Sequence, residues 1–188
     1  MAGFNSNEIT VAARTFLHLA PVGTTAPADA TVALGASWLN VGATTPDGTQ
    51  FTTSPTFQEV PTAQSDYPAI RFQTADDATL AVVLLQWNLT NFKAVYGGGS
   101  ITTIAGSPTQ YKFNPPIIGE HGETAAILES VFGTKRYRFV FPRVMQTEGV
   151  QLDLQRGQES RLPLSFKILG SDSVLPWYLL TNDPAFAS

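Results

Sequence analysis

The chain has 188 residues and a mass of 20.2 kDa, the size of one domain that can bury a core of its own. Apolar residues make up 43% and aromatic residues 11% of the sequence, a composition that excludes a disordered chain. Charged residues make up only 14%, against about 25% in ordinary soluble domains. A surface so poor in charge predicts that part of it is buried against other subunits.

The net charge of −4 argues against general adhesion to nucleic acid. The absence of cysteine excludes disulfides, thiolate metal sites and a cysteine nucleophile. Residues 1–8 lack the basic and apolar segments of a signal peptide, and the apolar stretch 80–85 is too short to span a membrane. We therefore expect a protein that is made in the cytoplasm, without a membrane partner.

The N-terminal half contains five strand candidates, at 9–19, 37–41, 50–60, 69–74 and 80–85. The segment 42–68 spans one of them, but it also holds four prolines and only three charged residues, so we interpret it as a long turn-rich loop. Its side chains Asp47, Phe51, Phe57 and Tyr67 are candidates for contacts between subunits, because aromatic residues commonly anchor such contacts.

One short helix is predicted after the fifth strand candidate. Asn88 is a suitable N-cap, Phe92 and Tyr96 share one face with Leu89, and Gly97 is a suitable stop. The following segment, 102–123, is rich in proline and glycine, and we expect a long ordered loop there.

The C-terminal third predicts a four-stranded meander. Its strands are expected at 125–131, 136–141, 150–154 and 162–168, because apolar and polar residues alternate there. Pro142 and Pro163 lack a donor for the ladder and should lie at edges or bulges. The predicted fold is mainly β, a β-sandwich or partly closed barrel with one short helix. It forms a single domain over 1–188, with an N-terminal arm at 1–8 and a C-terminal tail at 171–188.

No catalytic, cofactor or metal site emerges from the sequence. His18 lies in an apolar strand, His121 in a glycine-flanked turn, and neither has a second ligand at metal-binding spacing. Ser37 lacks the second glycine of a nucleophile elbow, and the glycines at 97–99 follow the helix instead of preceding it, unlike a phosphate loop. We therefore predict that the protein is not an enzyme and needs no cofactor.

The only cluster of charge is the basic stretch 135–143. Alternation along the strand places Arg136 and Arg138 on the face opposite Tyr137 and Phe139. We expect the aromatic face to fill the core. The two arginines should face a neighbouring subunit or the lumen of an assembly, paired with carboxylates of another strand or chain.

The order of motifs along the chain resembles the major tail proteins, or tail tube proteins, of long-tailed bacteriophages with non-contractile tails, especially those of actinobacteria. The likeness rests on LAPVGTTAP at 19–27, WLNVG at 38–42 with TPDG at 45–48, the strand and helix ending in VYG at 95–97, the closing meander, and WYLLTNDP at 177–184. One departure is Gln-Trp at 86–87, where such proteins often carry Glu before the helix.

The resemblance implies a structural virion protein whose subunits form hexameric rings that stack into a tail tube. It implies a tape-measure protein inside the tube during assembly, and a tail terminator and a distal tail protein at its ends. DNA would pass through the lumen without specific binding, and the tube would be assembled in the host cytoplasm before it functions in the virion.

Two alternatives remain open from the residues alone. One is a carbohydrate-binding β-sandwich that uses Trp38, Trp87 or Trp177 as a platform. The other is a decoration protein of a capsid or tail.

Overall fold

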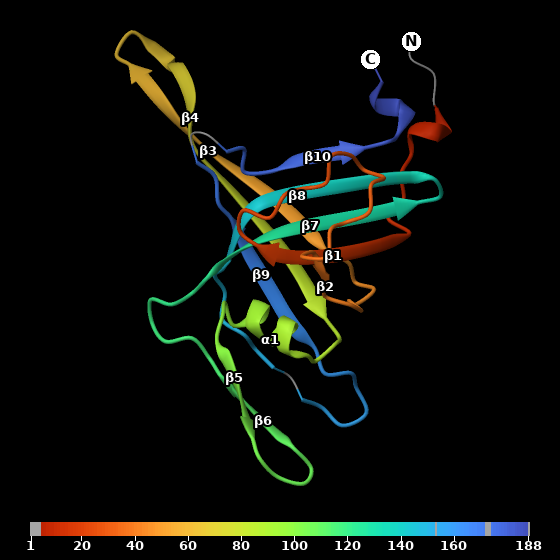
Figure 1. Cartoon of the computed structure of the whole chain (residues 1–188). Helices are drawn as coiled ribbons and strands as arrows, with labels where there is room; N and C mark the ends of the chain where they lie inside the picture. Colours follow the sequence, from red (N-terminus) through yellow and green to blue (C-terminus); the bar gives the residue numbers. More distant parts are fainter. Residues whose placement is uncertain (1–4, 153, 172–173, 188) are drawn as a thin grey trace.

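The computed structural model describes residues 5–152, 154–171 and 174–187 (Figure 1). The strands are β1 (Arg14–Pro21), β2 (Leu39–Asn40), β3 (Gln50–Thr62), β4 (Ser65–Leu84), β5 (Ser100–Ile104), β6 (Gln110–Asn114), β7 (Glu123–Phe132), β8 (Lys135–Gln146), β9 (Leu162–Ile168) and β10 (Tyr178–Thr181). The helices are the 3-10 turns η1 (Ser6–Glu8) and η2 (Pro184–Phe186) and the α-helix α1 (Leu89–Val95). The prediction of a mainly β fold with one short α-helix is confirmed.

One antiparallel sheet makes up most of the molecule. Its strands run in the order β2-β1-β7-β8-β9-β4-β3, and β10 pairs with the free side of β8. Figure 1 shows β1, β7, β8 and β10 as one layer, which β3, β4 and β9 cross as a second layer. The sheet does not close into a barrel, so of the two expected architectures the open, sandwich-like one is correct.

The two layers are joined within β8, where the sheet bends. The first half of β8 pairs with β10, whereas Val144 and its two successors pair with β9. A β-bulge in the β7–β8 pairing lies between these halves and contains Pro142, which has no amide hydrogen to contribute. Pro163 lies in β9 where no strand pairs on its outer side, so both prolines occupy the positions that their chemistry requires.

The main core lies between the two layers. Its largest fully buried members include Leu17 from β1, Leu80 and Leu84 from β4, and Phe141 and Phe166 from β8 and β9. A second, smaller apolar cluster covers the opposite face of β7 and β8, where Ile127 and Val140 pack under Trp38. The first layer is therefore covered on both faces. The other layer covers one face, and segment 22–38 covers the opposite face.

The expected loop at 42–68 is largely wrong, because 50–62 forms β3. This strand pairs with β4 almost to the end of the hairpin, so the segment is a β-hairpin whose distal part leaves the body. Figure 1 shows this projection at the upper left. The prolines are tolerated because a two-stranded ribbon has two free edges and needs few donors, and because Pro61 lies at a bulge. We call residues 54–77 the arm.

The helix begins and ends where the sequence predicts. The Asn88 side chain accepts the backbone N–H of Asn91, and Gly97 ends the helix with a φ of +69°, a value that favours glycine. Phe92 and Tyr96 are partly buried against the main core, whereas Leu89, which the sequence places on the same face, is 45% exposed.

Three further expectations are corrected. The stretch 102–123 is not a loop throughout, since β5 and β6 form a second projecting hairpin. No strand forms at 150–152 or at residue 154, because β9 already pairs with β8 at Val144–Gln146 and with β4 on its other side; residue 153 lies outside the described residues. The expected C-terminal tail contributes β10 to the sheet. Within the described ranges, no helix has the length and apolar character needed to cross a membrane.

Candidate assembly surfaces and pockets

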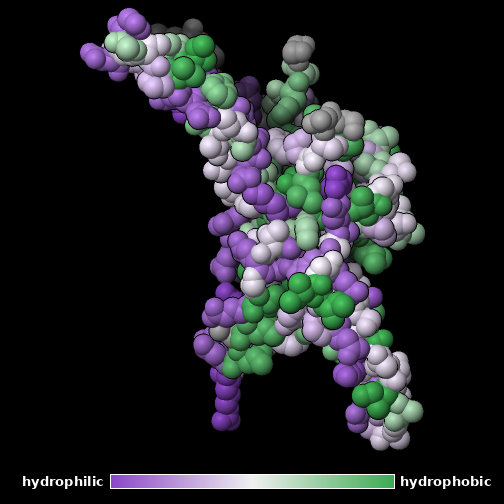
Figure 2. All heavy atoms as spheres, turned by 90° about the vertical axis from the view of Figure 1, so that its left-hand side faces the viewer, coloured by the Kyte–Doolittle hydropathy of each residue, from purple (hydrophilic) through white to green (hydrophobic). Residues whose placement is uncertain are grey.

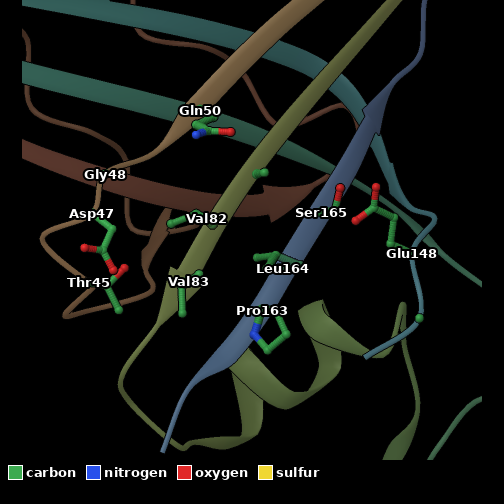
Figure 3. A pocket seen from close by; sticks show the side chains of 12 residues that line it. Thr45, Asp47, Gly48, Gln50, Val82, Val83, Glu148, Pro163, Leu164 and Ser165 are labelled. Carbon is green, nitrogen blue, oxygen red and sulfur yellow. The ribbon is translucent and has the colours of Figure 1, made fainter. Parts of the chain in front are cut away.

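A cavity of about 260 Å³ at the junction of β4 and β9 holds two carboxylates (Figure 3). Asp47 and Glu148 line it from opposite sides, with β4 and β9 between them in Figure 3. Among the residues that the structure describes, no three His, Asp or Glu side chains come together at a potential metal site.

Asp47 and Phe51, two of the residues predicted to make contacts between subunits, are engaged within their own chain. The Asp47 carboxylate lies 3.5 Å from the Arg161 guanidinium at the surface. The Phe51 ring contacts those of Phe141 and Trp177 at centroid distances of 5.2 and 5.1 Å. Pairing with β4 turns the Phe51 side chain toward the core, and its contact with another subunit stays a prediction.

Phe57 and Tyr67 lie on the arm and are exposed. Tyr67 is 80% exposed, and Phe57 is 45% exposed. The guanidinium of Arg71 lies 4.6 Å from the centre of the Phe57 ring and also 3.7 Å from a carboxylate oxygen of Glu59. Glu59 and Arg71 thus neutralise each other on one face of the arm, and the exposed apolar side chains of the arm remain available for contacts.

Arg138 is buried inside its own chain and faces neither a neighbour nor a lumen. Its side chain is 2% exposed, and one nitrogen lies 3.2 Å from a carboxylate oxygen of Glu129 on β7. The other terminal nitrogen donates to the backbone carbonyls of Asp29 and Val32, at 2.9 and 2.7 Å. The alternation of faces was predicted correctly, but the sequence did not reveal that segment 22–38 covers the arginine face.

Arg136 shares the same carboxylate from a more exposed position. Its guanidinium lies 3.1 Å from the Glu129 oxygen that also pairs with Arg138, and its side chain is 43% exposed. The predicted pairing with a carboxylate of another strand is therefore made within the subunit. Close to this group, burial lowers the pKa of His18, so its imidazole is neutral at pH 7, as a structural histidine would be.

A second polar cluster, which the sequence analysis missed, fastens the C-terminal segment to β8. The Tyr137 hydroxyl donates to the Asp183 carboxylate, and the Lys135 ammonium lies 2.9 Å from it. The hydrogen bond from Tyr137, a backbone N–H from Ala185 and the Lys135 ammonium together lower the pKa of Asp183 to about 2. Asp-Pro-Ala at 183–185 is an N-cap signal for a helical turn and could have revealed the position of Asp183.

The three tryptophans lie in separate environments. Trp38 is buried in the smaller cluster, whereas Trp177 packs in the main core beside Phe51. Trp87 is 44% exposed, and its indole N–H donates to the Ser160 carbonyl at 3.2 Å. Two of the three rings are therefore covered within the subunit, and Trp87 is the one candidate for a sugar platform that is substantially exposed.

Comparison with known proteins gives the family. None of the curated proteins matches the chain. A family model described as phage tail tube protein matches residues 2–188. Since this match covers almost the whole chain, the chain belongs to the phage tail tube proteins, structural components of the virion tail that assemble into its tube.

Proposed function

We propose that this protein forms hexameric rings that stack into the tail tube of a long-tailed phage with a non-contractile tail, and that the tube delivers DNA. The tube surrounds a tape-measure protein during assembly in the host cytoplasm and is closed by a tail terminator and a distal tail protein. The subunit performs no catalysis. Its net charge of −4 suits a conduit, because DNA should slide past the wall without adhering.

The observation that carries this proposal is the arm. Residues 54–76 contain no buried side chain, yet five of their large apolar residues are more than two-fifths exposed: Phe57, Val60, Tyr67, Ile70 and Phe72. Figure 2 shows hydrophobic side chains among hydrophilic ones on this projection, at the upper left. A two-stranded ribbon is unstable alone in water, so its length and composition support a role in contact with another subunit.

Apolar surface also occurs at the other end of the subunit. On the β5–β6 hairpin, Tyr111 is 70% exposed and Ile104 is 45% exposed. Figure 1 shows this hairpin pointing away from the body on the side opposite the arm. A subunit with apolar projections at two opposite ends suits head-to-tail stacking, in which each ring contacts one ring above and one below.

The test is negative-stain electron microscopy of the purified chain at high concentration. We expect rings or tubes with a central hole and sixfold end views for the natural sequence. A persistent monomer, or binding of single copies to a capsid lattice, would contradict the proposal and favour a decoration protein.

The matched variant lacks the distal arm. Residues 57–74 are replaced by Asn-Gly, so that a two-residue turn joins Thr56 to Ala75. These two residues are already paired in the natural hairpin. This cut leaves Phe51 and the core intact, so the variant should melt cooperatively as a monomer but form no tubes. Tubes of normal length from this variant would show that the arm is not the stacking element, and the N-terminal arm would then be the next candidate.

A further inference from the structure

An apolar groove lies between α1 and the adjoining ends of β1 and β7. We call it the helix groove. It has a volume of about 400 Å³, within the range of pockets that hold a ligand. Its apolar wall includes Leu19, Leu39, Leu89, Ala94 and Phe166, and Lys93 lies beside them. Two of these apolar residues are strongly exposed: Leu39 is 50% and Leu89 is 45% exposed.

Leu89 and Lys93 point to an occupant outside the subunit. They are four residues apart on α1, so they share one face of the helix beside the groove. Lys93 is exposed and forms no ion pair with the described residues, although eight ion pairs occur among them. The segment that fits an apolar groove with one unpaired cation at its edge is itself apolar and carries a carboxylate.

The arm has the complementary surface. Val60 and Ile70 are directly paired across the two strands, and Phe72 follows Ile70 by two positions, so these three side chains share one face. They are 42%, 61% and 45% exposed. Glu59 and Arg71, the charged pair of the arm, occupy the next register position and therefore the opposite face. We call Val60, Ile70 and Phe72 the apolar stripe.

Charge completes the match. Asp66 lies near the tip of the arm, beyond the apolar stripe, and it forms no ion pair with the described part of the chain. Asp76 is a second carboxylate of the arm without an ion pair among the described residues, but it lies at the base of the arm, where it pairs with Pro55 in the ladder. The carboxylate near the tip of the arm and the ammonium beside the helix groove have opposite sign. Such a pair fixes the orientation of a contact more than it adds affinity.

We propose that the apolar stripe of one copy of this chain occupies the helix groove of a second copy, with Asp66 close to Lys93. The arm cannot fill the groove of its own chain, because it leaves the body on the side away from α1 (Figure 1). The contact is therefore heterologous, and a heterologous contact can repeat without limit along a tube. This inference rests on the proposed tube, since it names the surface that receives the arm.

The absence of cysteine in the natural sequence allows a clean crosslinking test. Ile70→Cys places a thiol on the apolar stripe and Leu89→Cys places one beside the helix groove. Both positions are exposed, so both variants should fold. The two single variants are mixed under assembly conditions and treated with a short bis-maleimide. We expect a crosslinked dimer that contains one copy of each variant, distinguished by a tag on one of them.

The matched control is Ile118→Cys, at a fully exposed position that does not line the helix groove. Mixed with Ile70→Cys, it should give no dimer above the background of unassembled protein. Crosslinking of Ile70→Cys to itself, or equal crosslinking to both partners, would overturn the inference.

A charge exchange provides a second test. Asp66→Lys alone and Lys93→Glu alone should each reduce tube formation, measured by light scattering, and the double variant should recover it. Failure of the double variant to form more tubes than either single variant would also overturn the inference.

These tests separate the proposed contact from the proposed function. If the natural chain forms tubes but these tests fail, the proposed tube remains valid and only the assigned contact is wrong. If the natural chain forms no tubes, the proposed function itself fails.

Discussion

Replacement of Arg138 by alanine tests the assignment of this residue to the interior of the subunit. The guanidinium is almost fully buried, pairs with Glu129, and donates to two backbone carbonyls of the covering segment 22–38. Its removal leaves the Glu129 carboxylate, which is 8% exposed, with Arg136 as its remaining partner. The two backbone carbonyls also lose the donor that Arg138 provided. Had Arg138 faced a neighbour or the lumen, its loss would have weakened assembly but not folding.

The expected loss in the free energy of unfolding follows from how deeply each arginine is buried. Breaking a buried ion pair by removing one partner costs about 3–5 kcal/mol. We expect about 3 kcal/mol for Arg138→Ala, at the lower end of this range, because Arg136 still contacts the Glu129 carboxylate in this variant. Arg136 is the matched control, since it contacts the same Glu129 oxygen at nearly the same distance but is 43% exposed. For Arg136→Ala we expect about 1 kcal/mol, because water solvates its position and Arg138 still neutralises the carboxylate.

The assay is urea unfolding of each variant at a concentration at which the chain is monomeric, followed by tryptophan fluorescence. Trp38 packs in the cluster above this face of β8 and reports on the covering segment. Equal losses for the two variants, or a loss below about 1 kcal/mol for Arg138→Ala, would refute the reasoning from burial.

Two further predictions concern the ends of the subunit. Phe92→Ala should cost about 2 kcal/mol, less than the 3–5 kcal/mol of a fully buried phenylalanine, because Phe92 is only partly buried against the rings of Trp87 and Phe113. Hydrogen exchange should then accelerate in β5 and β6, and unchanged exchange there would show that the ring contacts do not hold this hairpin. Asp183→Asn should lower the melting temperature at pH 7, because the carboxylate of Asp183 has a pKa of about 2 in the folded chain, below its ordinary 3.8, and stabilises the fold only when ionised. The difference from the natural chain should shrink as the pH falls from about 4 to 2, and a difference that persists below pH 2 would contradict the ionic origin.

Local chemistry determined much of this protein from the sequence alone. The helix bounds follow from Asn88 and Gly97, because an N-cap acceptor and a glycine with positive φ act within one turn of the chain. The pattern around Tyr137 and Arg138 gave the correct faces of β8, since alternation is a property of any strand. The order of such local motifs also led to the correct family.

Only the tertiary structure decided which surfaces are covered. The alternation of side chains along a strand assigns Arg138 to one face of β8. Whether that face is buried depends on segment 22–38, whose residues Asp29 and Val32 are more than a hundred residues away from Arg138 in sequence. In the same way, Phe51 and Phe57 look alike in sequence, yet one packs in the core and the other lies on the arm. The physical reason is that burial depends on long-range pairing and packing, and these arise from elements that no local pattern can place side by side.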